Sequence, residues 1–263
     1  MKPRDCTLKM FSPAALAMGA LCAFVWPAAA AQPANNAFGI DTKFQTKGLT
    51  TELGPIGFVS HNNTGAYDKS VHVSKVNEDA PIVSQPVPPT IFINASGINS
   101  HVQSSGIGVD SEVTQANAAT DHASLTLNLN PPPGSEMPIP FPALQVQGSG
   151  IVSQANFNTI AVGPTTATGS SSVRSLRIIG TLVGTSPLTY SGSAPPNTVI
   201  YDSPTVTITL NKQIQSGLIS CTPDCVFKVY SITVDAVDIS LNKANVDGHK
   251  VSGDIVLSES LAQ

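Results

Sequence analysis

The sequence has few charged and few aromatic residues, and this excludes several kinds of partner. Charged side chains make up 11% and aromatic side chains 5% of the 263 residues, and the formal net charge is −4. Lysine and arginine are scattered along the chain, so no basic cluster is present to neutralise the phosphates of nucleic acids or of anionic membranes. The only tryptophan, Trp26, lies near the N-terminus. The aromatic rings left for binding sugars are chiefly Tyr67 and Tyr190, which lie near glycines.

The motifs of the common catalytic sites are also missing. No G-x-S-x-G, G-x-G-x-x-G or P-loop pattern occurs. The five histidines are far apart and form neither H-x-H nor H-E-x-x-H; they are His61, His72, His101, His122 and His249. We therefore expect no catalytic residue, metal site or cofactor, and we read scattered histidines as surface or strand positions.

Long apolar runs are absent except at the N-terminus, which predicts a secretory signal over residues 1–31. Lys2, Arg4 and Lys9 precede an apolar stretch from Phe11 to Trp26, and an alanine run follows. Cleavage after Ala31 would leave a chain that begins at Gln32. The stretch is shorter than the roughly 20 residues of a membrane-spanning helix, so an uncleaved anchor is the less favoured alternative. We expect a secreted or periplasmic protein with no membrane span in the mature chain.

Cysteine is scarce too, because only Cys221 and Cys225 of the four remain after cleavage. They bracket Pro223 and Asp224, both common in turns. In an exported protein this spacing favours a disulfide across a tight turn. A redox site would have C-x-x-C, and a zinc site would need further ligands near by.

Apolar and polar residues alternate in many segments, whereas no segment has helical periodicity over three turns. This alternation predicts half-buried β-strands. The clearest segments are SVHVSK (70–75), TIFINA (90–95), SLTLNL (124–129) and VTITL (206–210).

Two segments change phase in a way that predicts bent strands. In 231–241, Ile232 and Val234 share one face with Ala236, and the apolar set then continues from Val237 in the opposite phase. A β-bulge at Ala236–Val237 would restore one buried face. The segment 170–183 shows the same slip between Val173 and Leu176. Long bent strands are typical of sandwiches and barrels, so we predict an all-β fold, an antiparallel β-sandwich of jelly-roll-like or immunoglobulin-like type.

Two proline-rich segments, 80–90 and 131–142, are predicted to be loops or edge segments because proline lacks the ladder donor. Neither is a convincing linker, so 32–263 is predicted to be a single domain, with 131–142 as the alternative boundary.

Aspartates concentrate near the C-terminus, at Asp235, Asp238, Asp247 and Asp254. A calcium site would need several such oxygens to converge, and a glycosidase would need two carboxyl groups at a set separation. Neither arrangement follows from spacing alone, and aspartates in turns are the commoner case.

Several segments, in order, resemble the choice-of-anchor P family of exported bacterial β-rich proteins. They are AFGID (37–41), ATGSSSVRSLRIIGTLV (167–183), PPNTVI (195–200), VTITLNKQ (206–213), SITVDAVDISL (231–241) and GDIVLSESLA (253–262). Where members often show Asn and His, this chain has Asp235 and Asp238, and Lys212 stands where an acidic residue is usual. The resemblance implies a β-rich domain without a transferable activity. Since the chain ends soon after 253–262, it also implies release into the periplasm or outside the cell.

We therefore expect a non-enzymatic, exported structural or interaction protein whose partner is a cell-surface polymer or another exported protein. A carbohydrate-binding module is the first alternative, and a glycoside hydrolase with an unrecognised acidic pair is the second.

The Cys221–Cys225 disulfide is directly testable. Mass spectrometry of peptides from unreduced, freshly exported protein should find the pair oxidised, because the exported compartment favours disulfides. Two thiols that alkylate without reduction would contradict the assignment.

Overall fold

Thirteen β-strands account for nearly all of the described chain. The computed structural model describes residues 34–263 except 48, 63–64, 83–89, 106–110, 129–141, 161–164, 222–224 and 247, and gives backbone alone at 34, 111, 160, 218–221 and 225–229. The strands are β1 (Ala34–Thr46), β2 (Leu49–Ile56), β3 (Val59–Asn62), β4 (Tyr67–Pro81), β5 (Thr90–Ser104), β6 (Ser111–Asn128), β7 (Leu144–Ile160), β8 (Thr166–Gly180), β9 (Gly184–Ser193), β10 (Thr198–Asp202), β11 (Val206–Cys221), β12 (Cys225–Val246) and β13 (His249–Ala262). Among these described residues no helix is long and apolar enough to span a membrane.

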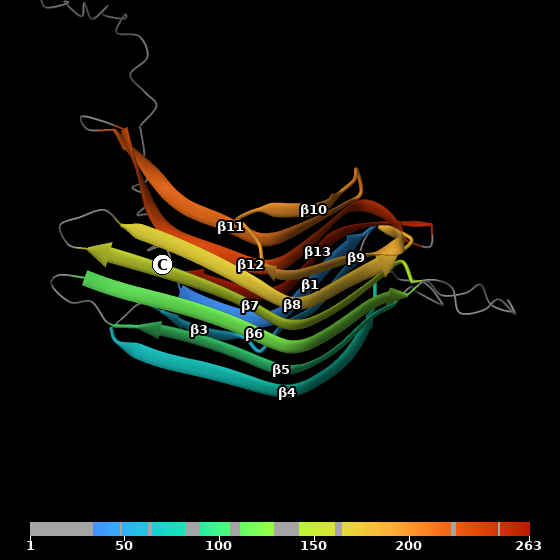
Figure 1. The fold of residues 1–263 in the computed structure, drawn as a ribbon, viewed down its shortest axis with the longest axis horizontal. Coiled ribbons are helices and arrows are strands. Elements are labelled where there is room, and N and C mark those ends of the chain that lie inside the picture. The colour runs from blue at the N-terminus through green and yellow to red at the C-terminus, as the bar shows by residue number, and fades with distance from the viewer. Residues whose placement is uncertain are drawn as a thin grey trace, which may run out of the picture. The chain divides into compact units, whose positions relative to one another are not determined.

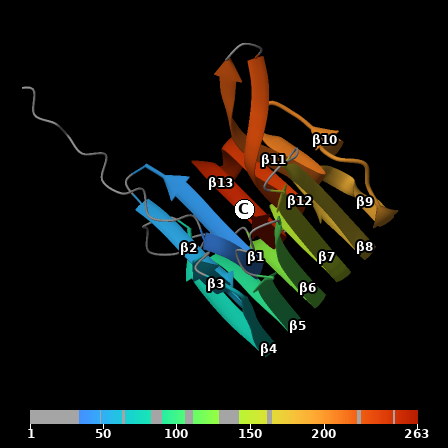
Figure 2. The same ribbon diagram turned by 90° about the vertical axis from the view of Figure 1, so that its left-hand side faces the viewer.

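The strands form two antiparallel sheets that pack face to face, which confirms the predicted β-sandwich (Figure 2). Sheet A has the order β10-β11-β12-β13-β1-β2, with β3 also paired to β1, and sheet B has the order β4-β5-β6-β7-β8-β9. Both are built mainly from consecutive strands, whereas jelly rolls and immunoglobulin domains use Greek keys. The long-range pair β1–β13 places the first strand beside the last. Residues 33–263 form one compact unit.

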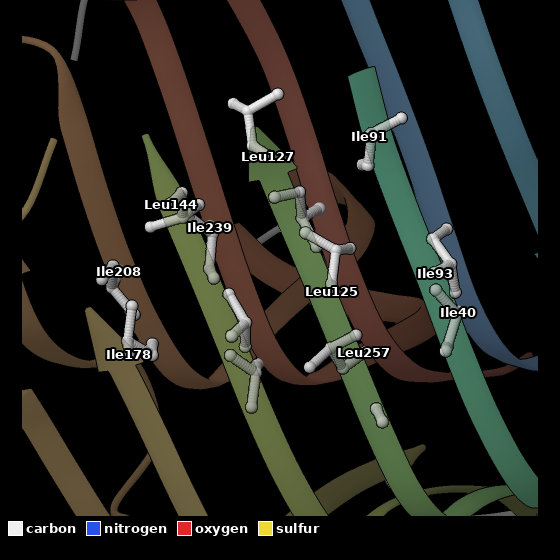
Figure 3. Close-up of a cluster of buried hydrophobic side chains, with 14 of the residues drawn as sticks. Ile40, Ile91, Ile93, Leu125, Leu127, Leu144, Ile178, Ile208, Ile239 and Leu257 are labelled. Atoms are coloured by element: carbon white, nitrogen blue, oxygen red, sulfur yellow. The ribbon is translucent and has the colours of Figure 1, made fainter. Parts of the chain in front are cut away.

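Alternating apolar side chains from both sheets fill the core. The predicted strands supply Ile91 and Ile93 from β5, Leu125 from β6 and Ile208 from β11, each at most 1% exposed. In Figure 3 these side chains lie between the sheets together with Leu257 of β13 and Ile239 of β12. The period-two segments of the sequence thus become strands with one buried face.

In sheet A the alternation of inward and outward side chains reverses along one line that crosses β11, β12, β13 and β1. Ala236 and Val237 of β12 are both fully buried, which confirms the predicted reversal. The pairs Lys212↔Asp235 and Leu210↔Val237 show, however, that β11 keeps its register past this point. The predicted β-bulge at Ala236–Val237 is therefore wrong, because no extra residue is inserted in β12 there. Neighbouring strands share the reversal instead. Successive buried pairs also occur at Leu210–Asn211, Leu257–Ser258 and Gly39–Ile40.

Sheet B carries the complementary change, with successive outward residues. Asp121 and His122 of β6 are both exposed, and so are Arg174 and Ser175 of β8, where the sequence predicts the slip. Gly97 of β5 and Gly150 of β7 pass through this level with φ values of 64° and 54°, which glycine adopts readily. In sheet A the alternate strands use Asn211 (φ 49°) and Ser258 (φ 56°). The strands bend near mid-length in Figure 1.

Buried hydroxyl groups join the two sheets at this bend. Thr120 and Ser258 lie with their hydroxyl oxygens 3.4 Å apart, and the Ser258 hydroxyl donates to the Ile151 carbonyl oxygen at 3.2 Å. One step further on, the Ser153 and Ser260 hydroxyl oxygens are 2.8 Å apart. Ser258 lies in the sheet interface with no exposed surface. The shared reversal turns it inward.

The two proline-rich segments fall largely outside the described residues. The prolines of 83–89 and of 131–141 belong to the undescribed parts. Pro81 is the last residue of β4, an edge strand of sheet B, where a missing ladder donor is tolerated.

Deleting residues 251–263 should abolish cooperative folding. β13 lies between β12 and β1 in sheet A, and Val251, Ile255 and Leu257 have no exposed surface. Each buried aliphatic side chain contributes roughly 1.5–3 kcal/mol, so the loss is on the order of 5–9 kcal/mol against a typical total of about 5–15 kcal/mol. Circular dichroism melting measures this, and Lys250→Ala, an exposed change on the same strand, is the control. A truncated chain that melts at the temperature of the intact one would show that β13 is dispensable.

Candidate functional site

The C-terminal aspartates do not come together as one group. Asp235 and Asp238 of β12 are each 4% exposed, whereas Asp254 of β13 is exposed, and Asp247 lies outside the described residues. Within the described part of the chain no three acidic, histidine or cysteine side chains are arranged to hold a metal ion. A calcium site built on these aspartates is therefore not supported.

Two ionisable partners of these aspartates come from other strands. Lys212 of β11 forms a salt bridge to Asp238, with Nζ 3.0 Å from Oδ2. Glu259 of β13 lies directly opposite Asp235 in the β12–β13 register. Glu259 was not singled out from the sequence, because its position depends on which residues pair across two strands.

Burial sets the protonation of the Asp235–Glu259 pair. It raises the pKa of Asp235 to about 7, with repulsion by Asp238 adding to the effect. Burial, the charge of Asp235 and the hydrogen bond to Asp235 together raise the pKa of Glu259 to about 8. The carboxyl groups of buried Asp235 and half-buried Glu259 are hydrogen-bonded and cannot both ionise at low cost, so near neutral pH the pair holds a proton.

The Lys212–Asp238 salt bridge lies beside this pair and responds to it. Burial lowers the pKa of Lys212, but the charges of Asp238, Asp235 and Asp254 outweigh burial and leave it raised. Burial raises the pKa of Asp238 although Lys212 opposes this. Asp235 Oδ1 is buried and has no hydrogen-bond partner among the described residues. A protonated pair reduces the charge that must be buried here.

This acidic cluster does not have the geometry of a glycosidase. The two carboxyl groups are hydrogen-bonded to each other, whereas hydrolysis requires a separation of roughly 5–10 Å that admits the sugar and water. None of the three hollows described next is lined by Asp235, Asp238 or Glu259. The cluster is best explained as part of the folded framework.

Of three hollows lined by described residues, the largest lies on sheet B, at the bend, and we call it the bend hollow. Its volume is about 800 Å³, and its lining is His122, Gln147, Gly148, Ser149, Ser175, Leu176, Arg177, Thr189, Tyr190 and Ser191. This volume is within the usual range of about 300–1,000 Å³ for small-ligand sites.

Strand register arranges the polar groups of the bend hollow in two rows. Gln147, Arg177 and Thr189 lie opposite one another on β7, β8 and β9. His122, Ser149 and Ser175 form the other row across β6, β7 and β8, and the two serine hydroxyl oxygens are 2.7 Å apart. The second row belongs to the successive outward residues of the bend. Hydroxyl, amide, imidazole and guanidinium groups therefore face the same space.

The two tyrosines considered for sugar binding both line hollows, and neither is a fully exposed ring. Tyr190 lines the bend hollow but is half-buried and packs against the core. Tyr67 lines a second hollow of about 530 Å³ and stacks on His61 with ring centroids 4.2 Å apart. Its hydroxyl is hydrogen-bonded by Asn35. Neither ring offers the free aromatic platform that the sequence suggested.

The remaining histidines serve strand contacts. His72 and His101 line a third hollow, of about 310 Å³. His72 Nδ1 lies 2.7 Å from Asn99 Oδ1, and His101 Nε2 lies 2.9 Å from Asp68 Oδ1. His249 begins β13. Cys221 and Cys225 are paired in register at the ends of β11 and β12, and the disulfide between them stays a prediction.

Comparison with known proteins adds no assignment: no family model matches the chain, and no curated protein or solved structure is significantly similar to it. The resemblance to the choice-of-anchor P family therefore stays a proposal.

The Asp235–Glu259 pair should make the fold less stable as pH rises from about 4 to about 8. Unfolded carboxyl groups lose their protons near pH 4, whereas the folded pair, with pKa values of about 7 and 8, keeps a proton. The folded state thus binds more protons than the unfolded state across this window. Each additional bound proton lowers the unfolding free energy by about 1.4 kcal/mol for every unit by which pH rises.

Asp235→Asn should flatten this dependence and raise stability at pH 8, as measured by melting temperature at pH 5, 6, 7 and 8. Asp79→Asn is the control, because Asp79 is an exposed acid on β4 of the other sheet. Equal slopes in the wild type and Asp235→Asn would contradict the proton-sharing pair.

Proposed function

We propose that this protein is an exported, non-enzymatic interaction protein that binds carbohydrate of the cell surface or extracellular matrix in the bend hollow. The observation that carries the proposal is the lining of that hollow, which holds Gln147, Arg177 and His122 but no carboxylate. Amide, hydroxyl and imidazole groups can donate and accept the hydrogen bonds that sugar hydroxyls require. A few such groups that converge in a concave site are typical of ligand recognition.

A non-enzymatic role agrees with what surrounds the hollow. Ser149 and Ser175 contact each other, and neither lies within a described serine–histidine–acid arrangement of the kind that activates a nucleophile. The Asp235–Glu259 pair belongs to sheet A, and neither residue lines the hollow. Hydrolase activity is therefore the weaker alternative.

Export and family membership are part of the same proposal and rest on the sequence. The signal-like residues 1–31, the closely spaced Cys221 and Cys225 and the ordered segments shared with choice-of-anchor P proteins support it. A carbohydrate ligand suits such a protein because surface polymers are what it would meet outside the cell.

Binding should be visible on an array of neutral and acidic bacterial polysaccharides, confirmed by titration of the selected glycan. Gln147→Ala should weaken binding about 2- to 10-fold, since one neutral hydrogen bond contributes about 0.5–1.5 kcal/mol. Gln145→Ala is the matched control, because Gln145 is the next residue on the same face of β7 and does not line the hollow. Absence of selective binding, or equal loss in both variants, would overturn the proposal.

A further inference from the structure

Arg177 is the one permanently charged group that lines the bend hollow. It lies between Gln147 of β7 and Thr189 of β9, directly opposite each of them. It takes part in none of the salt bridges between described residues. A half-buried guanidinium without a protein carboxylate has its donors available to a ligand.

The neighbouring charges do not neutralise Arg177 from within the hollow. Asp121 is the acidic residue adjacent to the lining residue His122, and its carboxylate lies against Gly97 of β5, on the side of β6 away from β7. Arg174 lies against Gly150 of β7 and outside the lining. Gly97 and Gly150 thus leave room for the side chains of Asp121 and Arg174, neither of which lines the hollow.

The position of Arg177 is notable in a chain with so few arginines. The sequence has three, Arg4, Arg174 and Arg177, within a net charge of −4. General attraction to anions is therefore weak, and an anionic ligand would have to be recognised locally. A guanidinium does this well, because its planar donors match a carboxylate in a two-bond geometry.

The half-buried state of Tyr190 also bears on the choice of ligand. Neutral sugars are commonly held by stacking on an exposed aromatic ring, and this ring packs against the core. The hollow instead offers a charged donor flanked by an amide and a hydroxyl. That set favours a sugar unit that carries a carboxylate as well as hydroxyl groups.

We infer that the bend hollow selects acidic polysaccharide, with Arg177 paired to the carboxylate of a uronic acid unit and with Gln147 and Thr189 bonded to adjacent hydroxyls. This inference rests on the proposed carbohydrate-binding function and specifies its substrate class.

The test compares two charge-matched variants of the intact mature protein. Arg177→Gln and Arg174→Gln each remove one guanidinium from β8, but only Arg177 lines the hollow. Isothermal titration against oligogalacturonate, and against a neutral galactan of equal length, measures the affinities at low and physiological salt. Melting temperatures confirm that both variants fold.

The wild type should bind the uronate oligomer at least tenfold more tightly than the neutral one, because charge-assisted bonds are about twice as strong as neutral ones. Arg177→Gln should remove that preference, and Arg174→Gln should change affinity less than threefold. Equal losses in the two variants would indicate general electrostatic attraction and overturn the inference. Equal affinity for both oligomers would overturn the inference while leaving the proposed function intact. If no glycan on the array or in titration binds, the proposed function fails and the inference with it.

Discussion

The bend shared by the two sheets is the constraint on which the remaining structure depends. The alternation of inward and outward side chains reverses at the same level in neighbouring strands, so the strands stay in register and the two inner faces remain opposed on both sides of the bend. Sheet A gains successive inward residues such as Ala236 and Val237, and sheet B gains successive outward residues such as Asp121 and His122. The Thr120 and Ser258 hydroxyls join the sheets at this level and satisfy polar groups that have no access to water.

The bend also decides where polar surface is available. The outward residues of sheet B place His122, Ser149 and Ser175 beside the row of Gln147, Arg177 and Thr189, and the hollow forms between β6 and β9. Glycines at 97 and 150 are needed because the strands pass through left-handed backbone there, and because the Asp121 and Arg174 side chains occupy the space above them. Fold and candidate site therefore share one structural cause.

The charged residues of the two sheets differ in whether they are paired within the protein. Sheet A buries Asp235 and Asp238 and balances them with one lysine and a retained proton, an arrangement whose energy depends on pH. Sheet B leaves Arg177 in a hollow without a carboxylate. The carboxyl groups of the acidic cluster contact Lys212 and each other and line none of the three hollows, whereas the guanidinium of Arg177 lines one. This difference is why we propose a ligand site on sheet B, although the acidic residues are the more conspicuous feature of the sequence.

The sequence by itself determined the strands, the sandwich class and the positions of the phase reversals, because alternation and its interruption are local properties that one face of a sheet must obey. Segments such as 90–95 and 206–210 could be assigned in this way, and Val173–Leu176 could be identified as a slip. Only the tertiary structure decided that the reversals coincide across strands, that Glu259 meets Asp235, and that Arg177 lies between Gln147 and Thr189. Those relations depend on which strands pair and in which register. The local sequence pattern does not specify this pairing, because the residues involved are far apart along the chain.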